Sequence, residues 1–252
     1  MNAPSPAPPI APCFTLVIPA YNESAWLPQL LDSVDAARAR YRGGAGAIEV
    51  VVGNNASTDA TAEIATARGC RVAFVEKRAI AAARNGGAAI ARGEILCFID
   101  ADSRIHPDTF NAIDDVMRSG RAVVGSTGVH PDRWSPGIFF TWLLAVPLVW
   151  LLRMDAGVMF CRRADFEAIG GYDEQMLYAE DIRVLVDLKR LGRARGQKFV
   201  RAKGVLAITS TRKYDKHGDW HYLTVMPRIG FWMLIDKNRW AHFAHKYWYE
   251  DR

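Results

Sequence analysis

The chain has 252 residues, of which 50% are hydrophobic and 23% charged, and its net charge is +5. This composition indicates one globular domain of ordinary size, and the mild basic excess favours anionic partners without choosing among nucleotides, phosphates, nucleic acid and anionic lipid. The four cysteines are scattered without a C-x-x-C pair or a metal-like spacing, which favours buried thiols in a reducing compartment over a cysteine-based metal site.

The first elements alternate between strand and helix. Residues 1–12 are rich in proline and alanine, lack the features of a secretory signal, and are expected to be a disordered tail. A strand is predicted at residues 14–18 and closes at Pro19, and Ser24 is expected to cap the helix that follows. The next predicted elements are strands at 48–52, 71–75 and 95–99, and helices at 60–68 and 79–91. This alternation predicts an α/β fold with a parallel, doubly wound sheet.

The second half continues the pattern around one uncharged stretch. Residues 134–152 carry no charge but are barely long enough to span a membrane and contain two prolines, so we expect a buried or interfacial helix pair. The other expected elements are helices at 108–118, 163–169 and 180–191, and strands at 122–127 and 157–161.

Asp100 and Asp102 follow the apolar run 95–99 directly. Carboxylates at the carboxyl end of a buried strand lie where open α/β sheets bind ligands. Carboxylate oxygens suit a hard divalent cation, which often carries phosphate with it. The alternative is a pair of solvated loop aspartates that cap the next helix.

Two more polar clusters end predicted strands, Tyr21-Asn22-Glu23 and Asn54-Asn55. Because parallel strands end at one edge of a sheet, these clusters and the two aspartates predict a nucleotide site. Asn22 and Asn54 are suited to hydrogen bonds with a base or a ribose, and equally to ordinary turns.

Later segments supply two further candidates. Glu180 and Asp181 open a predicted helix, where they suit either a general base or helix capping. Arg212, Lys213 and His217 lie in a polar stretch that is expected to form a loop, either closing over phosphates or simply solvated. Residues 221–252 are amphipathic, aromatic and basic, which suits a membrane surface, a second subunit or the domain's own core.

Several short motifs occur in an order and spacing that resemble the family 2 glycosyltransferases with the GT-A fold, over residues 14–220. They are V-I-P-A-Y-N-E at 17–23, N-N-A-S-T-D at 54–59, A-R-N-G-G at 83–87, A-R-G-E-I-L-C-F-I-D-A-D at 91–102, G-G-Y-D-E at 170–174 and E-D at 180–181. The resemblance implies a Rossmann-like nucleotide-sugar-binding domain over residues 13–220, followed by a helical segment at 221–252.

The same resemblance implies that one sugar moves from a nucleotide-diphosphate sugar, UDP- or GDP-linked, to an acceptor hydroxyl with inversion and with Mn²⁺ or Mg²⁺. Asp102 would ligate the metal, and Asp181, beside Glu180, would be the general base. The residues implied to meet the nucleotide are Pro19, Tyr21, Glu23, Asn54, Arg84 and Asp100. We expect Arg212 and Lys213 to meet the diphosphate, and His217 to reach the metal.

The chain departs from the family pattern at two places. Asn54 stands where the family usually has Asp, which leaves the identity of the nucleotide's base undecided. The Q-x-x-R-W motif of processive members is missing. A nucleotidyltransferase on a related fold would carry a Gly-rich basic loop where this chain has P-A-Y-N-E, and a non-catalytic binding or scaffold protein is the other alternative. We expect a cytoplasmic protein, peripheral at the inner membrane face, acting on a lipid-linked or glycan acceptor; no nucleic-acid motif is found, and a homodimer stays open.

Overall fold

A computed structural model describes residues 13–152, 157–176 and 179–225 of the chain. The tail at 1–12 and most of the C-terminal segment, 226–252, lie outside the described residues, so the expectations for these two segments stay predictions.

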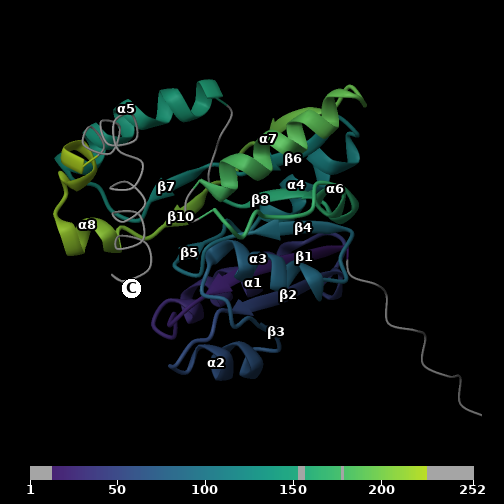
Figure 1. Cartoon of the computed structure of the whole chain (residues 1–252), viewed down its shortest axis with the longest axis horizontal. Coiled ribbons are helices and arrows are strands. Elements are labelled where there is room, and N and C mark those ends of the chain that lie inside the picture. Colours follow the sequence, from purple (N-terminus) through teal and green to yellow (C-terminus); the bar gives the residue numbers. More distant parts are fainter. Residues whose placement is uncertain (1–12, 153–156, 177–178, 226–252) are drawn as a thin grey trace, which may run out of the picture.

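A seven-stranded sheet forms the centre of the molecule, with the order β3-β2-β1-β4-β8-β6-β9 (Figure 1). Neighbouring strands are parallel except at β8, which runs antiparallel to both β4 and β6. The α/β fold with a mostly parallel sheet is therefore confirmed. The strands are β1 (Phe14–Ala20), β2 (Ile48–Asn54), β3 (Arg71–Phe74), β4 (Ile95–Phe98), β6 (Ala122–Ser126), β8 (Met159–Arg162) and β9 (Lys198–Arg201).

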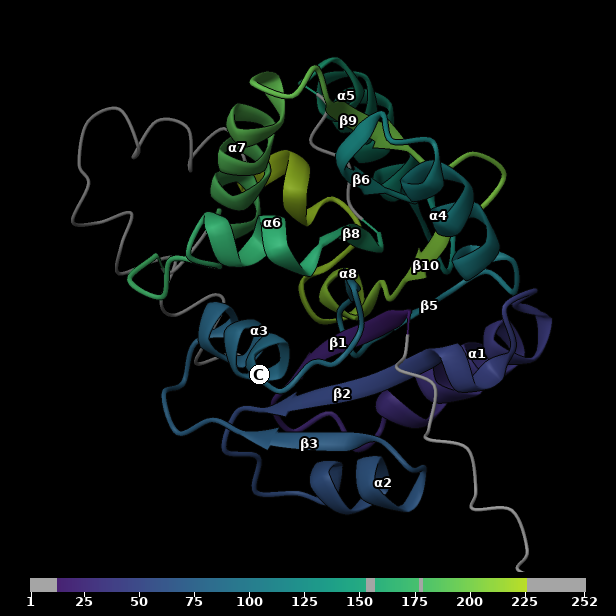
Figure 2. The ribbon, with the colours of Figure 1, turned by 90° about the vertical axis from the view of Figure 1, so that its right-hand side faces the viewer.

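Helices cover both faces of this sheet, because successive residues of a buried strand point to opposite sides. On β1, Leu16 and Ile18 pack in one cluster with α1 and α4, whereas Val17 packs in a second cluster with α3, α6 and α7. Figure 2 shows α1 and α4 on the right of the sheet and α3, α6 and α7 on its left. The helices are α1 (Leu27–Arg40), α2 (Thr61–Ala67), α3 (Ile80–Ala89), α4 (Thr109–Arg118), α6 (Arg163–Ala168) and α7 (Glu180–Arg193).

Helix α3 approaches the sheet closely because of a glycine. A Cβ on Gly53 of β2 would lie 2.1 Å from the Ala83 carbonyl oxygen. The bare glycine lets α3 pack directly on β2, which places Arg84, the next residue of α3, near the carboxyl ends of the strands.

A second, three-stranded sheet was not expected. It pairs β5 (Ser103–Arg104), β10 (Ala207–Thr209) and β7 (Val129–Pro131) in the order β5-β10-β7. Since β10 pairs antiparallel with β5, directly after Asp102, the chain around residue 210 is held beside the two aspartates. A short 3-10 helix, η1 (Ala45–Ala47), precedes β2.

The structure corrects three expectations. Ser24 does not cap the first helix; α1 begins at Leu27, and the Ser24 amide instead donates to Asp59 Oδ2 at 3.0 Å. The uncharged stretch forms one helix, α5 (Pro136–Leu152), with Pro147 inside it, rather than a helix pair. The polar stretch expected to be a loop begins as a short helix, α8 (Arg212–His217).

None of the helices in the described part of the chain has the length and apolar character that a membrane crossing requires.

Candidate active site

The carboxyl ends of β1 and β4 open into a pocket of about 410 Å³. Its other walls are α3, the start of α7, the end of β10 and the start of α8, with Trp142 of α5 at one side. The pocket lies at the edge where the polar clusters were expected. Ten of the predicted site residues line it: Pro19, Tyr21, Glu23, Arg84, Asp100, Asp102, Glu180, Asp181, Arg212 and Lys213.

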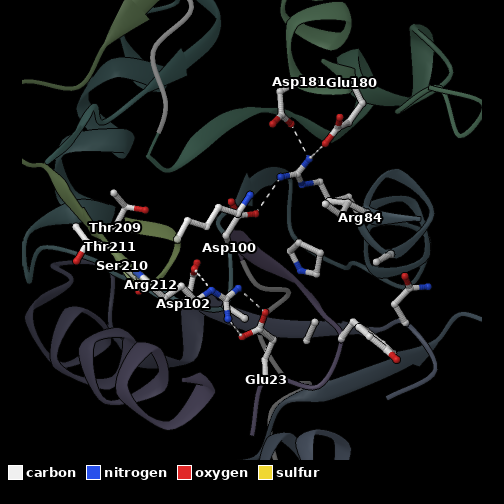
Figure 3. Close-up of a pocket in the computed structure, with 18 of the residues that line it drawn as sticks. Glu23, Arg84, Asp100, Asp102, Glu180, Asp181, Thr209, Ser210, Thr211 and Arg212 are labelled. Carbon is white, nitrogen blue, oxygen red and sulfur yellow. Dashed lines mark hydrogen bonds and ion pairs between the residues drawn. The ribbon is translucent and has the colours of Figure 1, made fainter. Parts of the chain in front are cut away.

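Arg84 joins three carboxylates in the upper half of the pocket (Figure 3). Its Nη1 donates to Glu180 Oε1 at 2.9 Å and to Asp181 Oδ1 at 2.7 Å, and its Nη2 donates to Asp100 Oδ1 at 3.0 Å. The Arg84 side chain is buried, and its guanidinium carbon lies 5.2 Å from the centre of the Tyr172 ring. Burial alone would lower the pKa of Arg84. The three carboxylates raise the pKa by more than burial lowers it, so this side chain is a permanent cation.

The pKa of Asp181 is raised from its usual 3.8 to about 6. The main cause is desolvation within the pocket walls, and the charges of Glu180 and Asp100 raise it further, whereas Arg84 lowers it. The carboxylate nevertheless faces the pocket, since 51% of the side chain is exposed. An accessible carboxylate with a pKa near neutral pH suits a general base.

The backbone before this acid is held in a rare conformation. Ala179 has φ 58, in the left-handed region that alanine seldom adopts, and it precedes Glu180 and Asp181 at the start of α7. Such conformations cost about 1–3 kcal/mol and occur at functional sites.

Arg212 organises the lower half of the pocket. Its two Nη atoms donate to the Glu23 carboxylate, each at 2.8 Å, and its Nε lies 2.9 Å from Asp102 Oδ2 (Figure 3). Burial lowers the pKa of Arg212, but Glu23 and Asp102 raise it overall. Glu23, which was expected to line the nucleotide, lines the pocket, and its almost fully buried carboxylate anchors Arg212.

Three predicted residues are not part of the pocket lining. Asn54 is buried and its Oδ1 accepts a hydrogen bond from the Ser57 amide, while Asn22 has φ 53 and accepts from the Thr58 amide. Both asparagines therefore perform the turn chemistry that was the alternative for them. The ring of His217 stacks on that of His221, with centroids 4.6 Å apart.

Sequence reasoning missed several residues that do line the pocket. Asn55 takes the place expected for Asn54, and Trp142 and Tyr222 come from segments that had no role in the predicted site. The turn after β10 contributes Thr209, Ser210 and Thr211, and the Thr211 hydroxyl donates to Asp132 Oδ1 at 2.7 Å. The sequence offered a signal for Asn55, because it stands beside Asn54 in an Asn-Asn pair. It offered none for the turn after β10, because the position of that turn depends on long-range strand pairing.

The donor set at Asp100 and Asp102 fits a divalent cation that arrives with a diphosphate. The described residues contain no group of three or more His, Cys, Asp and Glu side chains placed to hold a metal by themselves. Mg²⁺-like ions, however, are commonly held by one or two carboxylates together with substrate phosphates. Asp100 and Asp102 offer these hard oxygen donors at the pocket wall, with Arg84 and Arg212 as their present partners.

Two solved structures among those with the same fold contain a bound nucleotide sugar. Staphylococcus aureus TarS in complex with UDP-GlcNAc matches with a TM-score of 0.60 and 22% identity, over 79% of this chain and 58% of that chain. The mannosyltransferase PcManGT from Pyrobaculum calidifontis, in complex with GDP-Man and Mn²⁺, also matches with a TM-score of 0.60 and 22% identity, over 82% of this chain and 60% of that chain.

Sequence comparisons point the same way. Glycosyltransferase GlyA of Streptococcus pneumoniae is 28% identical over 135 residues, which are 52% of this chain and 18% of that protein. The chain thus spans a small part of the curated relative and about three-fifths of each solved structure. The family model described as glycosyl transferase family 2 matches residues 15–143, about half of the chain. The chain belongs to glycosyl transferase family 2.

Proposed function

We propose that this protein is an inverting glycosyltransferase that moves one sugar from a nucleotide-diphosphate sugar to an acceptor hydroxyl. The observation that carries the proposal is the division of the pocket into two sides. Asp181, with its raised pKa, lies on one side, and Asp102 lies on the other with Arg212. An in-line displacement needs a base on one face of the sugar and a stabilised leaving group on the opposite face.

Asp181 is proposed to accept the proton of the attacking hydroxyl. Arg84 holds its carboxylate in place at 2.7 Å and lowers its pKa enough for the ionised form to be present near neutral pH. Glu180 is mostly buried and accepts a hydrogen bond from the same guanidinium, so its role is to hold Arg84 in position. A single positioned base fits a single displacement, and this outcome is inversion.

The opposite side of the pocket is proposed to hold the diphosphate. A Mn²⁺ or Mg²⁺ ion bound by Asp102 and Asp100 would supply positive charge to the departing nucleoside diphosphate. Arg212 and Lys213 line the same wall, and Arg212 is held in position by Glu23. Tyr21 and Asn55 lie at the ends of β1 and β2, where a base and a ribose would be accommodated. Structural relatives that bind UDP-GlcNAc or GDP-Man support this donor class.

The test is donor turnover in purified variants. We expect release of UDP or GDP from UDP- or GDP-sugars to require Mn²⁺ or Mg²⁺. Asp181→Asn should lower turnover by about 10²–10⁴-fold, the usual contribution of a general base, while nucleotide binding measured by calorimetry is retained. Asp102→Asn should weaken metal-dependent nucleotide binding itself.

Asp187→Asn is the matched control, because Asp187 lies on the same helix α7 outside the pocket lining. Full turnover by Asp181→Asn would eliminate the base assignment. Release of pyrophosphate from a nucleoside triphosphate would indicate the nucleotidyltransferase alternative, and nucleotide binding without turnover of any donor would indicate a binding protein.

A further inference from the structure

Helix α5 carries a group of exposed apolar side chains to which the proposed function assigns no role. The structure describes twelve large apolar side chains that are exposed, and eight of them belong to α5 or to the neighbouring Trp134 and Trp220. Apolar side chains gathered in one exposed patch mark an interaction site more often than scattered ones do. The six on α5 are Phe139, Phe140, Leu143, Leu144, Val146 and Leu151.

This helix is apolar on every side, not along one stripe. It contains no charged residue, and all five residues from 143 to 147 are exposed. Five consecutive helical residues extend around more than one full turn, since a turn takes about 3.6 residues. A second copy of the chain or a short segment would cover one face of such a helix, whereas an apolar medium covers its whole circumference. The exposure pattern therefore favours lipid over a protein partner.

Three of the four aromatic residues of α5 lie in its first two turns. Near its first turns, Phe140 stacks on Trp220 with ring centroids 6.0 Å apart, and Trp134 lies 5.8 Å from Trp142. Among the side chains that the structure describes, the exposed ones after Trp142 are aliphatic and include Leu144 and Leu151. Aromatic rings prefer the headgroup level of a bilayer and aliphatic side chains prefer its interior, so the first two turns of α5 suit the headgroups and the turn that follows them suits the hydrocarbon.

The polar groups beside the aromatic end suit an anionic surface. Arg133 pairs with Asp219 at 2.7 Å and also with Asp215, and offsets part of their negative charge. Lys213 and Lys216 of α8 add positive charge next to them. Basic residues near a membrane attract anionic lipid headgroups.

The length of α5 limits how deeply it enters. Its 17 residues extend about 25 Å at roughly 1.5 Å per residue, less than the ~30 Å hydrocarbon core of a bilayer. The helix also reaches the candidate active site, because Trp142 lines the pocket together with Tyr214 and Tyr222. Figure 1 shows α5 at one end of the molecule, next to α8 and away from the seven-stranded sheet.

From these observations we infer that α5 inserts partway into an anionic lipid bilayer and holds the pocket beside the headgroups. This docking does not depend on the proposed function. Its corollary, that the acceptor hydroxyl belongs to a lipid-borne molecule, rests on that function.

Vesicle flotation of the full chain tests the docking, with no donor or acceptor present. We expect the protein to float with phosphatidylcholine vesicles that contain phosphatidylglycerol, and more weakly with phosphatidylcholine alone. The double variant Leu143→Glu/Leu144→Glu should raise the lipid concentration needed for half-maximal binding by roughly tenfold or more, because each buried leucine contributes apolar transfer free energy. Phe74→Glu is the matched control: Phe74 and Leu144 are both 67% exposed, but Phe74 lies on β3, and this variant should bind like the wild type.

Three results would overturn the docking. The first is a folded wild-type protein that binds neither kind of vesicle. The second is a Leu143→Glu/Leu144→Glu variant that binds vesicles as well as the wild type does. The third is a wild-type dimer in sedimentation velocity that becomes a monomer in this variant. The last result would assign the face to a second copy. Since no turnover is measured, failure of the docking is distinct from failure of the proposed function.

Discussion

At the scale of single residues, the candidate site consists of carboxylates that two arginines hold in fixed positions. Arg84 contacts Glu180, Asp181 and Asp100, and Arg212 contacts Glu23 and Asp102. Removing one partner of a buried ion pair leaves the other charge uncompensated, and this costs about 3–5 kcal/mol. Arg84 is therefore a positioning residue, and its effect should appear in the titration of Asp181.

The acid limb of the pH profile should report Asp181. Because the pKa of this carboxyl is raised to about 6, kcat/KM should fall below that pH as the base becomes protonated. Arg84 lowers this pKa, so Arg84→Met should move the limb to higher pH, whereas Arg84→Lys, which keeps the charge, should move it less. Initial rates measured across the pH range for the three proteins check this.

Stability should respond to the same group. The folded-state pKa of Asp181, about 6, lies above its usual 3.8, so the folded protein binds this proton more tightly than the unfolded chain does. The stabilisation is complete below about pH 4 and is lost as the pH rises through about 6. Urea titrations of Asp181→Asn at several pH values should lack this pH-dependent component of the stability. For the rate profile, an acid limb that is identical in Arg84→Met and the wild type would show that a group other than Asp181 titrates.

At the scale of elements, the sequence predicts what is local and misses what is assembled from distant segments. The strands β1, β2 and β4 are continuous apolar runs, so their positions were predicted within about two residues and their shared edge followed from parallel pairing. The pairing of Ile208 with Arg104 and the contact of Arg212 with Glu23 join residues far apart in the chain. Strands of two or three residues carry no periodic signal, so the second sheet and the contact of Arg212 with Glu23 could not be predicted.

The packing of α3 on β2 offers a prediction at this scale. In Gly53→Ala the new Cβ would lie 2.1 Å from the Ala83 carbonyl oxygen, so backbone must shift. Overpacking of this kind typically costs about 1–3 kcal/mol, and we expect a lower urea midpoint. The control is Gly46→Ala in η1, where a Cβ would meet nothing within 4 Å. Equal midpoints for the two variants would mean that α3 does not approach β2 this closely.

At the scale of the whole molecule, the fold leaves the pocket at an edge that the helix layers do not cover. Both faces of the central sheet are occupied by helices, so a ligand gains access at the strand ends, where β1 and β4 present Glu23, Asp100 and Asp102. The walls come from residues as far apart as Pro19 and Tyr222. Closing such a pocket around a ligand links binding to the stability of the entire domain.

Thermal unfolding should therefore detect the donor nucleotide and its metal together. A ligand at about 100 times its Kd stabilises the folded state by about 2.7 kcal/mol, which corresponds to roughly 5–10 °C in Tm for a domain of this size. We expect UDP or GDP with Mn²⁺ to raise Tm by several degrees, and EDTA to remove this rise. EDTA alone should leave Tm unchanged, since the proposed metal joins Asp100 and Asp102 to a diphosphate rather than holding the fold. Lys203→Gln, which removes a charge outside the pocket lining, should respond as the wild type does. A nucleotide-induced rise that persists in EDTA would show that the diphosphate is held by Arg212 and Lys213 without a metal.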